Sequence, residues 1–443
     1  MIEIISSGSE LLCGKENTSA PYICARLFDI GIHPSFITVV SDNKEDFPKV
    51  LETAFRRSSA IIITGGLGPT FDDITVETVA TAAGAQLCQS SEVLENIKKY
   101  FLNRGITLEG RMFEINSRQA NVIKGAKIIN NTLGTAPGQM FHFEYLSKDP
   151  ATGECGAKSR KTVFLFPGPP REMKPMFEAT ALPFFKSYQA QITKTLIFKI
   201  CAMPESQVEQ SLSPVMQALK ANQTIKTEFA ITAHGGIISF KVSVSSDNEL
   251  IVDETLKNIK LEVEKILGRN IFGYNEDTLE STVGKLLTKL QKKVSVAESC
   301  TGGAVASRIT SVAGASVYFG YGIVAYSNEA KQKILGVNEN TLESYGAVSE
   351  ETAAQMSEGV LNISASDYSI AVTGIAGPSG ATKEKPVGLV YIAVSEKKKA
   401  KGSSSPKIET KISKNMFSGN RQDITERAIV TALNMLRQTL EGK

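Results

Sequence analysis

The chain has 443 residues, with 49 Lys and Arg against 46 Asp and Glu, a net charge of +3 and a hydrophobic fraction of 42%. This length suits about two to four domains with their own cores and excludes a disulfide-stapled miniprotein. The near-balance of charge argues against a strongly basic nucleic-acid-binding protein, so nucleic acid is not an expected partner. No run approaches the roughly 18 apolar residues that a membrane helix needs, so we expect a soluble protein with no membrane partner.

The N-terminus, the cysteines and the histidines narrow the chemistry. Residues 1–8 have no basic start and no long apolar stretch, so nothing directs export and we expect a cytoplasmic protein. The 6 cysteines include no CxxC pair, which argues against a disulfide framework and against a structural zinc site. The 3 histidines are far apart in the sequence, so a Ser-His-Asp triad would have to be assembled from distant segments. Catalysis should therefore depend on carboxylates, Ser, Lys or Tyr.

Strands and helices alternate in the first segment. Strands are expected at 3–5, 37–40, 60–63 and 163–166, and helices at 20–30 and 47–57. Such alternation predicts a doubly wound α/β domain, in which helices cover both faces of a parallel sheet. Ligands of such sheets bind at the carboxyl ends of the strands.

Two glycine-containing loops follow strands of this segment. Their N–H groups could hold phosphate oxygens, and nearby carboxylates could hold a divalent cation. The phosphate-binding candidates are Gly66, Gly68 and Thr70, and the metal-ligand candidates are Asp72, Asp73 and Glu10. The two aspartates could equally cap a helix that begins at residue 74. Loops 134–138 and 167–170 could form further walls of the same cleft.

A smaller α+β unit is expected in the middle of the chain and a second α/β unit at its end. The middle unit has strands near 195–200, 229–232 and 237–244 and helices at 205–220 and 249–267, without a cluster of reactive side chains. A linker is expected near 272–277. A helix at 278–291 and a strand at 294–297 then open the last unit, in which the polar run 397–406 reads as a hairpin loop.

The strongest candidate for catalysis lies between the strand at 294–297 and a helical stretch at 304–312. There Ser299 is followed by Cys300, Thr301, Gly302 and Gly303. A serine on a strand-to-helix turn has backbone N–H groups nearby that can stabilise an oxyanion. The alternative is that Ser299 or Thr301 only caps the helix and that the glycines allow close packing.

Other residues of the last unit could complete such a site. Because no histidine is at hand, a lysine of lowered pKa could act as the base, and Lys331 begins a helix shortly after Tyr326. The loop containing Thr373 and Gly374 ends another strand and suits close approach to a ligand, although a plain tight turn explains it about as well. Arg421 precedes the last helix and could pair with phosphate or carboxylate.

These motifs, taken together, resemble the CinA competence/damage-inducible family over essentially the whole chain. The motifs that carry the resemblance are 8–12, 65–73, 134–138 and 167–173 in the first half, and 297–303, 326–331, 346–349, 373–378 and 385–388 in the second.

The resemblance implies three domains and two activities. The domains are a molybdopterin-binding-like α/β domain (1–175), a KH-like α+β domain (176–272) and an α/β amidase domain (278–443), commonly arranged as a homodimer. The last domain is similar to nicotinamide mononucleotide deamidase, which needs no cofactor. The first is similar to a metal-dependent ADP-ribose pyrophosphatase. Nucleotides are therefore the expected partners.

The resemblance also implies roles for individual residues. Ser299 matches the nucleophile and Lys331 the base, with Tyr326 and Arg421 as accompanying site residues. The alternative is a regulatory protein that binds a nucleotide or a pterin without turnover and acts in competence or the DNA damage response. The intact Ser299, Tyr326 and Lys331 favour the enzyme.

Some positions depart from the family pattern. Ser9 replaces a usual Thr, Asn420 a common Asp, and Thr425 a frequent Arg, so phosphate affinity and substrate choice are open. Residues 148–161 and 397–406 resemble insertions that extend hairpins.

Overall fold

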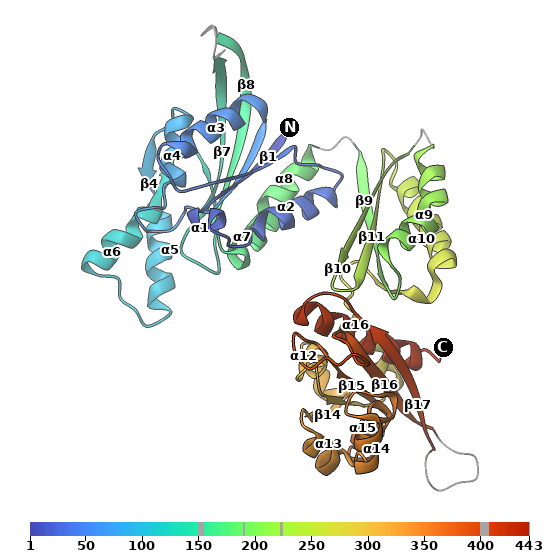
Figure 1. Ribbon diagram of the computed structural model, residues 1–443. Coiled ribbons are helices and arrows are strands. Elements are labelled where there is room, and N and C mark those ends of the chain that lie inside the picture. The colour runs from blue at the N-terminus through green and yellow to red at the C-terminus, as the bar shows by residue number, and fades with distance from the viewer. Residues whose placement is uncertain (149–154, 189–190, 222–224, 399–406, 443) are drawn as a thin grey trace. The chain divides into compact units, whose positions relative to one another are not determined.

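The computed structural model describes residues 1–148, 155–188, 191–221, 225–398 and 407–442. The chain divides into two compact units, Met1–Lys194 with Ser245–Glu249, and Thr195–Val244 with Leu250–Lys443. Among the described residues, no helix is long and apolar enough to cross a membrane. Figure 1 labels the helices and strands that follow.

The first unit is built on a six-stranded sheet with the order β2-β1-β3-β8-β7-β6. Its first four strands are parallel, and β7, which forms a hairpin with β8, runs antiparallel to both of its neighbours, β8 and β6. The strands are β1 (Ile2–Ser7), β2 (Phe36–Val40), β3 (Ala60–Thr64), β6 (Lys127–Ile129), β7 (Gly138–Lys148) and β8 (Cys155–Phe166), with a separate pair β4 (Leu87–Gln89) and β5 (Asn121–Ile123). The sheet is therefore mixed, and its parallel part is the one that the sequence predicts.

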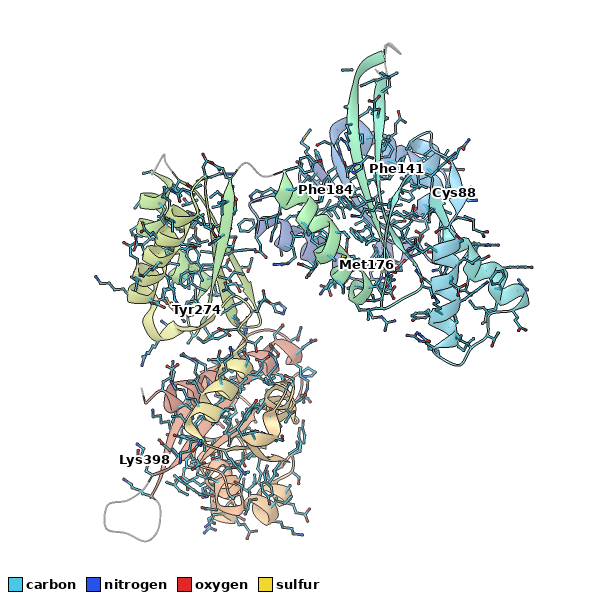
Figure 2. All side chains as sticks on the ribbon, turned by 180° about the vertical axis from the view of Figure 1, so that it is seen from behind. Cys88, Phe141, Met176, Phe184, Tyr274 and Lys398 are labelled. Carbon is cyan, nitrogen blue, oxygen red and sulfur yellow. The ribbon has the colours of Figure 1, made fainter. Side chains whose placement is uncertain are left out.

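Helices cover both faces of this sheet, which confirms the doubly wound prediction. Because side chains alternate along a strand, Ile61 and Ile63 of β3 belong to one core and Ile62 belongs to the other. Figure 2 labels Phe141 from the first core, and Met176 and Phe184 from the second. The helices are α1 (Ser9–Leu12), α2 (Ser19–Phe28), α3 (Asp46–Arg57), α4 (Thr75–Ala82), α5 (Ser91–Leu102), α6 (Gly110–Ser117), α7 (Pro170–Met176) and α8 (Leu182–Ser187).

The middle domain is a four-stranded sheet with two helices, and Figure 1 shows both helices on one of its faces. The strands, in the order β10-β11-β9-β12, are β9 (Ile192–Cys201), β10 (Lys226–His234), β11 (Ile237–Ser246) and β12 (Ile271–Tyr274), and the helices are α9 (Glu205–Lys220) and α10 (Glu249–Leu267). The expected linker at 272–277 is therefore partly a strand, because Ile271 and Phe272 are buried and β12 pairs with β9.

The last domain contains a five-stranded sheet with the order β14-β13-β15-β16-β17. The first three strands are parallel, so the loops after them leave the same edge of the sheet. The strands are β13 (Val294–Glu298), β14 (Phe319–Val324), β15 (Tyr368–Gly374), β16 (Leu389–Lys398) and β17 (Lys407–Met416), and the helices are α11 (Leu279–Leu290), α12 (Ala304–Thr310), α13 (Asn328–Leu335), α14 (Glu339–Tyr345), α15 (Glu350–Ile363) and α16 (Arg421–Leu440).

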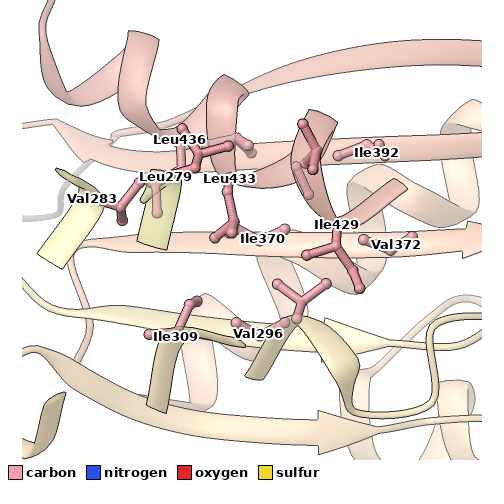
Figure 3. Packing of buried hydrophobic residues seen from close by; sticks show 14 of the residues in the cluster. Leu279, Val283, Val296, Ile309, Ile370, Val372, Ile392, Ile429, Leu433 and Leu436 are labelled. Atoms are coloured by element: carbon pink, nitrogen blue, oxygen red, sulfur yellow. The ribbon is translucent and has the colours of Figure 1, made fainter. Parts of the chain in front are cut away.

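Helices α11 and α16 pack on one face of this sheet. Figure 3 shows Ile429 and Leu433 of α16 beside Ile370 and Val372 of β15. On the other face, α15 contributes Met356 to a second core. This packing holds the strand ends, and the loops that follow them, in a defined position.

The two suspected insertions lie at hairpins. Strands β7 and β8 pair as far as Lys148 and Cys155, and β16 and β17 pair as far as Lys398 and Lys407. The loops themselves, 149–154 and 399–406, lie outside the described residues.

Candidate active site

Ser299 and Lys331 are in direct contact at the carboxyl edge of the last sheet. Ser299 follows β13, and its N–H donates to the carbonyl oxygen of Val372 in β15 at 2.9 Å. Lys331 Nζ donates to Ser299 Oγ at 3.1 Å. Both residues are buried, with exposed fractions of 9% and 1%. The fold thus brings together the two residues expected to act as nucleophile and base.

The surroundings of Lys331 are neutral. Its Nζ also donates to the carbonyl oxygens of Ala325 at 2.9 Å and Tyr326 at 3.1 Å. Within the described parts of the chain, no Asp or Glu forms an ion pair with it. Burial without a counter-charge lowers the pKa of Lys331 from its usual value. Helix α13, capped by the Ser327 hydroxyl, brings this lysine back over the strand end.

The turn after Ser299 is tightly wound. Gly302 and Gly303 have φ values of 62° and 97°, which glycine adopts readily. The Gly302 N–H donates to the Ser299 carbonyl oxygen at 3.1 Å, and the Gly303 N–H donates to the carboxylate of Glu298 at 3.1 Å. The N–H groups of Cys300 and Thr301 have no oxygen acceptor among the residues that the structure describes. Only these two remain available to a ligand, rather than the whole expected run 300–303.

Glu298 is a site residue that the sequence analysis missed. It ends β13, is 1% exposed, and its carboxylate also accepts the N–H groups of Val305 and Ala306 at 3.0 and 2.9 Å. The sequence signal that could have identified Glu298 is a carboxylate at the end of an apolar strand, directly before a glycine-containing turn.

A cavity of about 1260 Å³ adjoins this turn. Cys300, Thr301 and Gly302 line it, whereas Ser299 and Lys331 are not among its lining residues. The Thr301 side chain is 6% exposed, and its Oγ1 has no hydrogen-bond partner within the described structure. A buried hydroxyl without a hydrogen-bond partner thus lies next to the nucleophile turn.

Arg421 also lines this cavity, and it is the first residue of α16. Its guanidinium donates to the carbonyl oxygen of Gly377 at 2.8 Å and to the Tyr326 hydroxyl at 3.3 Å. Tyr326 is 61% exposed, and its hydroxyl contacts Arg421. Only the main-chain carbonyl oxygen of Tyr326 contacts Lys331. Asn420 caps α16 by accepting the N–H groups of Gln422 and Asp423.

Thr373 and Gly374 have structural contacts. The Thr373 hydroxyl is buried and donates to the carbonyl oxygen of Ala347 at 2.6 Å. A Cβ at Gly374 would lie 2.7 Å from the Leu389 carbonyl oxygen, so the close approach of β16 requires glycine there. The cavity is lined instead by the residues that follow in this loop, 376–378. Substrate contact by Thr373 and Gly374 stays a prediction.

The first unit has a cleft of about 690 Å³ at the carboxyl ends of its strands. The expected loops meet there: Gly66 and Gly68, Glu10, and residues of the 134–138 and 167–170 loops line it. Thr70 instead lines a neighbouring cavity of about 360 Å³.

The carboxylates of this cleft do not form a ready metal site. Lys15 pairs with Glu10 at 3.2 Å, the N–H and hydroxyl of Thr70 both bind Asp73, and Asp72 is exposed. Over the described residues, no group of three or more His, Cys, Asp or Glu is placed to hold a metal ion. The donor set of Asp72, Asp73 and Glu10 thus does not fit a divalent cation as it stands.

The suggested helix cap is also absent. Helix α4 begins at Thr75, and its N-cap, Ile74, has no side-chain cap. Instead, the Asp73 carboxylate accepts the N–H of Thr70 and closes the turn between these two residues.

Three family models match the chain in succession. They are "Probable molybdopterin binding domain" at residues 3–187, "Damage-inducible protein CinA KH domain" at 195–273 and "CinA C-terminal domain" at 276–440.

Relatives match this chain over nearly its whole length. A "CinA-like protein" of Endomicrobium trichonymphae is 48% identical over 442 residues, covering 100% of this chain and 99% of the relative. A "Putative competence-damage inducible protein" of Caldicellulosiruptor saccharolyticus is 40% identical, with 99% of both chains covered. Among solved structures, competence/damage inducible protein CihA from Agrobacterium tumefaciens is 39% identical, with a TM-score of 0.34, over 37% of this chain and 93% of that one.

Proposed function

We propose that this chain, which belongs to the CinA competence/damage-inducible family, hydrolyses nicotinamide mononucleotide to nicotinate mononucleotide and ammonia in its C-terminal domain. The observation that carries the proposal is the buried contact of 3.1 Å between Lys331 Nζ and Ser299 Oγ. A serine needs a base to become a nucleophile, and a lysine of lowered pKa can serve as one.

The contacts of Lys331 suit the neutral amine. Such an amine has two N–H bonds and one lone pair, and the carbonyl oxygens of Ala325 and Tyr326 provide two acceptors. The lone pair then faces Ser299 Oγ and can accept the hydroxyl proton. The lowered pKa of Lys331 supports the neutral form.

The proposed reaction has two steps. Ser299 Oγ attacks the carboxamide carbon as its proton passes to Lys331 Nζ, and the N–H groups of Cys300 and Thr301 stabilise the oxyanion. The C–N bond breaks, the nitrogen takes the proton from Lys331, and ammonia leaves an ester on Ser299. Water then attacks that ester with Lys331 as base, which releases the carboxylate and restores the hydroxyl.

Substrate binding is assigned to the cavity beside the turn. Arg421 has a planar fork of donors that suits a phosphate, and it lies among the lining residues with Thr301. Asn420 is a good helix cap, as the more common Asp is, so this departure from the family keeps Arg421 in position. Thr425 also lines the cavity. The family frequently has an arginine at this position, so the cavity lacks that cation here.

The first unit supports a second, coarser proposal. Its cleft, lined by glycine loops at strand ends, suits a phosphate-bearing nucleotide such as ADP-ribose. Because its carboxylates do not form a metal site, we derive no hydrolytic step there, and pyrophosphatase activity stays a prediction. The homodimer and the cytoplasmic location also stay predictions.

Ammonia release from nicotinamide mononucleotide by the purified chain tests the main proposal, with the product identified by mass. We expect Ser299→Ala to lose this release. Ser369→Ala is the matched control, because Ser369 is equally buried in the same sheet but bonds only to Ser357 among the described side chains. A folded wild type that releases no ammonia would contradict the proposal and favour the non-catalytic binding protein.

A further inference from the structure

Glu298 is a buried carboxylate without a cationic partner. Its side chain is 1% exposed, and no Lys or Arg pairs with it in the part of the chain that the structure describes. Instead it accepts the backbone N–H groups of Gly303, Val305 and Ala306 at 3.1, 3.0 and 2.9 Å. Burying a charge is costly unless hydrogen bonds compensate it, and here three do.

These bonds control which donors the turn offers to a ligand. The N–H groups of Val305 and Ala306, the second and third residues of α12, donate to the Glu298 carboxylate and are occupied. The N–H groups of Cys300 and Thr301 are left for the substrate carbonyl oxygen. Without the carboxylate, the turn from 299 to 303 would lose its anchor at Gly303.

Glu298 also supports the base through its main chain. Its carbonyl oxygen accepts the N–H of Ala325 at 2.8 Å, and the Ala325 carbonyl oxygen accepts Lys331 Nζ. One residue thus connects the turn that carries the nucleophile to the loop that holds the base.

The negative charge of Glu298 is felt on the cavity side of the turn. Burial raises the pKa of the Cys300 thiol to about 12, and the charge of Glu298 contributes to that rise. Cys300 lines the cavity. The charge of Arg421 acts on the same thiol with a larger and opposite effect, so Glu298 weakens the attraction of this part of the site for an anion without reversing it.

We propose that Glu298 is a positioning residue of the amidase site, which fixes the two donors at Cys300 and Thr301 and weakens the binding of the carboxylate product. This inference rests on the proposed function. It explains how a site with a cationic fork at Arg421 can release an anionic product.

The test compares Glu298→Gln, which removes the charge at constant size, with Glu298→Asp, which keeps the charge. Glu329→Gln is the control, because Glu329 is an exposed carboxylate of α13 paired only with Lys333 among the described residues. Each full-length variant is melted to establish folding. Two quantities are then measured: the rate at which a fluorophosphonate labels Ser299, read by peptide mass, and the inhibition constant of nicotinate mononucleotide relative to the KM of nicotinamide mononucleotide.

In Glu298→Gln, we expect the fluorophosphonate to label Ser299 about tenfold more slowly than in wild type. We also expect the carboxylate product to bind about tenfold more tightly relative to the substrate. Glu298→Asp should keep the wild-type preference for substrate over product, even if its shorter side chain slows labelling. Glu329→Gln should match wild type in both.

A Glu298→Gln variant that only melts earlier, with wild-type labelling and an unchanged ratio of constants, would overturn the inference. A wild type whose Ser299 is labelled but which does not turn over nicotinamide mononucleotide contradicts the proposed function alone, and the labelling comparison still decides the role of Glu298. A folded wild type whose Ser299 is never labelled contradicts both.

Discussion

At the level of single residues, the site depends on a lysine held by backbone carbonyls rather than by a carboxylate. The oxygens of Ala325 and Tyr326 orient Nζ without stabilising a charge as strongly as an ion pair does. Desolvation therefore dominates and lowers the pKa of Lys331. This is the condition that a lysine must meet to act as a base.

Replacing Lys331 should separate its chemistry from its packing. We expect Lys331→Met to lower ammonia release by about 10²–10⁴-fold, the usual contribution of a general base. Lys331→Arg should be equally impaired, because arginine stays protonated. Lys333→Met, two residues along the same helix and exposed, is the control. Activity comparable to wild type in Lys331→Arg would contradict the role of a neutral base.

The lowered pKa also predicts the pH dependence of stability. Unfolded Lys331 binds a proton below about pH 10.4, whereas the folded residue binds one only below its lowered pKa. Between these two values the unfolded state binds more protons, so this residue makes stability rise with pH. Chemical unfolding across this range should show a weaker rise for Lys331→Met than for wild type. Equal slopes would contradict the lowered pKa.

At the level of elements, the beginnings of helices place the functional groups. Helix α13 delivers Lys331, and α16 presents Arg421 as its first residue. The capping box of Asn420 and Asp423 determines where α16 begins.

Removing this cap should affect both stability and substrate binding. We expect Asn420→Ala to cost about 1 kcal/mol and to lower the melting temperature of the domain by about 2–4 °C. The KM for nicotinamide mononucleotide should rise, because Arg421 follows the cap directly. Asn420→Asp restores a capping oxygen and should melt like wild type. An Asn420→Ala variant with unchanged melting and KM would show that the cap does not position Arg421.

In the first unit, the turn after β3 requires glycine at position 65. Gly65 has φ of 103°, and a Cβ there would lie 2.0 Å from the Ser7 carbonyl oxygen. We expect Gly65→Ala to destabilise this unit by more than about 2 kcal/mol. Gly84→Ala is the control, because Gly84 also has a positive φ but no described atom lies within 4 Å of the added Cβ, so it should cost only about 1 kcal/mol. Urea unfolding measures the free energy of unfolding of both variants. Equal losses of stability in the two would contradict the clash at Gly65.

At the level of the whole molecule, the two candidate sites belong to different compact units. The cleft of the first unit is lined by residues from Ser7 to Glu172, and the cavity of the last domain by residues from Cys300 to Ile429. The two sites share no lining residue.

The sites should therefore respond independently to substitution. We expect Ser299→Ala to lose ammonia release while its affinity for ADP-ribose, measured by calorimetry, stays that of wild type. Asp73→Ala frees the Thr70 turn and should weaken ADP-ribose binding without changing ammonia release. If either folded variant loses both properties, the two sites are not separate.

The fold class and the pairing of Ser299 with Lys331 could be predicted from the sequence, and the order of the three domains from the resemblance to the CinA family. Strand and helix periodicity and the loops at strand ends are local properties, so a strand such as Ile61 to Ile63 could be predicted directly. The strand β12 was missed because its pairing with β9 is a long-range contact. The metal-ligand set stays a prediction from residue types, and in the structure Thr70 binds Asp73 and Lys15 pairs with Glu10.

Which N–H groups of the active-site turn are free could not be predicted from the sequence. From the sequence, all N–H groups of 300–303 were equal candidates for the oxyanion site. Their allocation depends on Glu298, whose buried carboxylate takes the donors at Gly303, Val305 and Ala306. Such competition for hydrogen bonds is decided by distance and burial in three dimensions, because an acceptor excluded from water must take whichever donors the fold brings within reach.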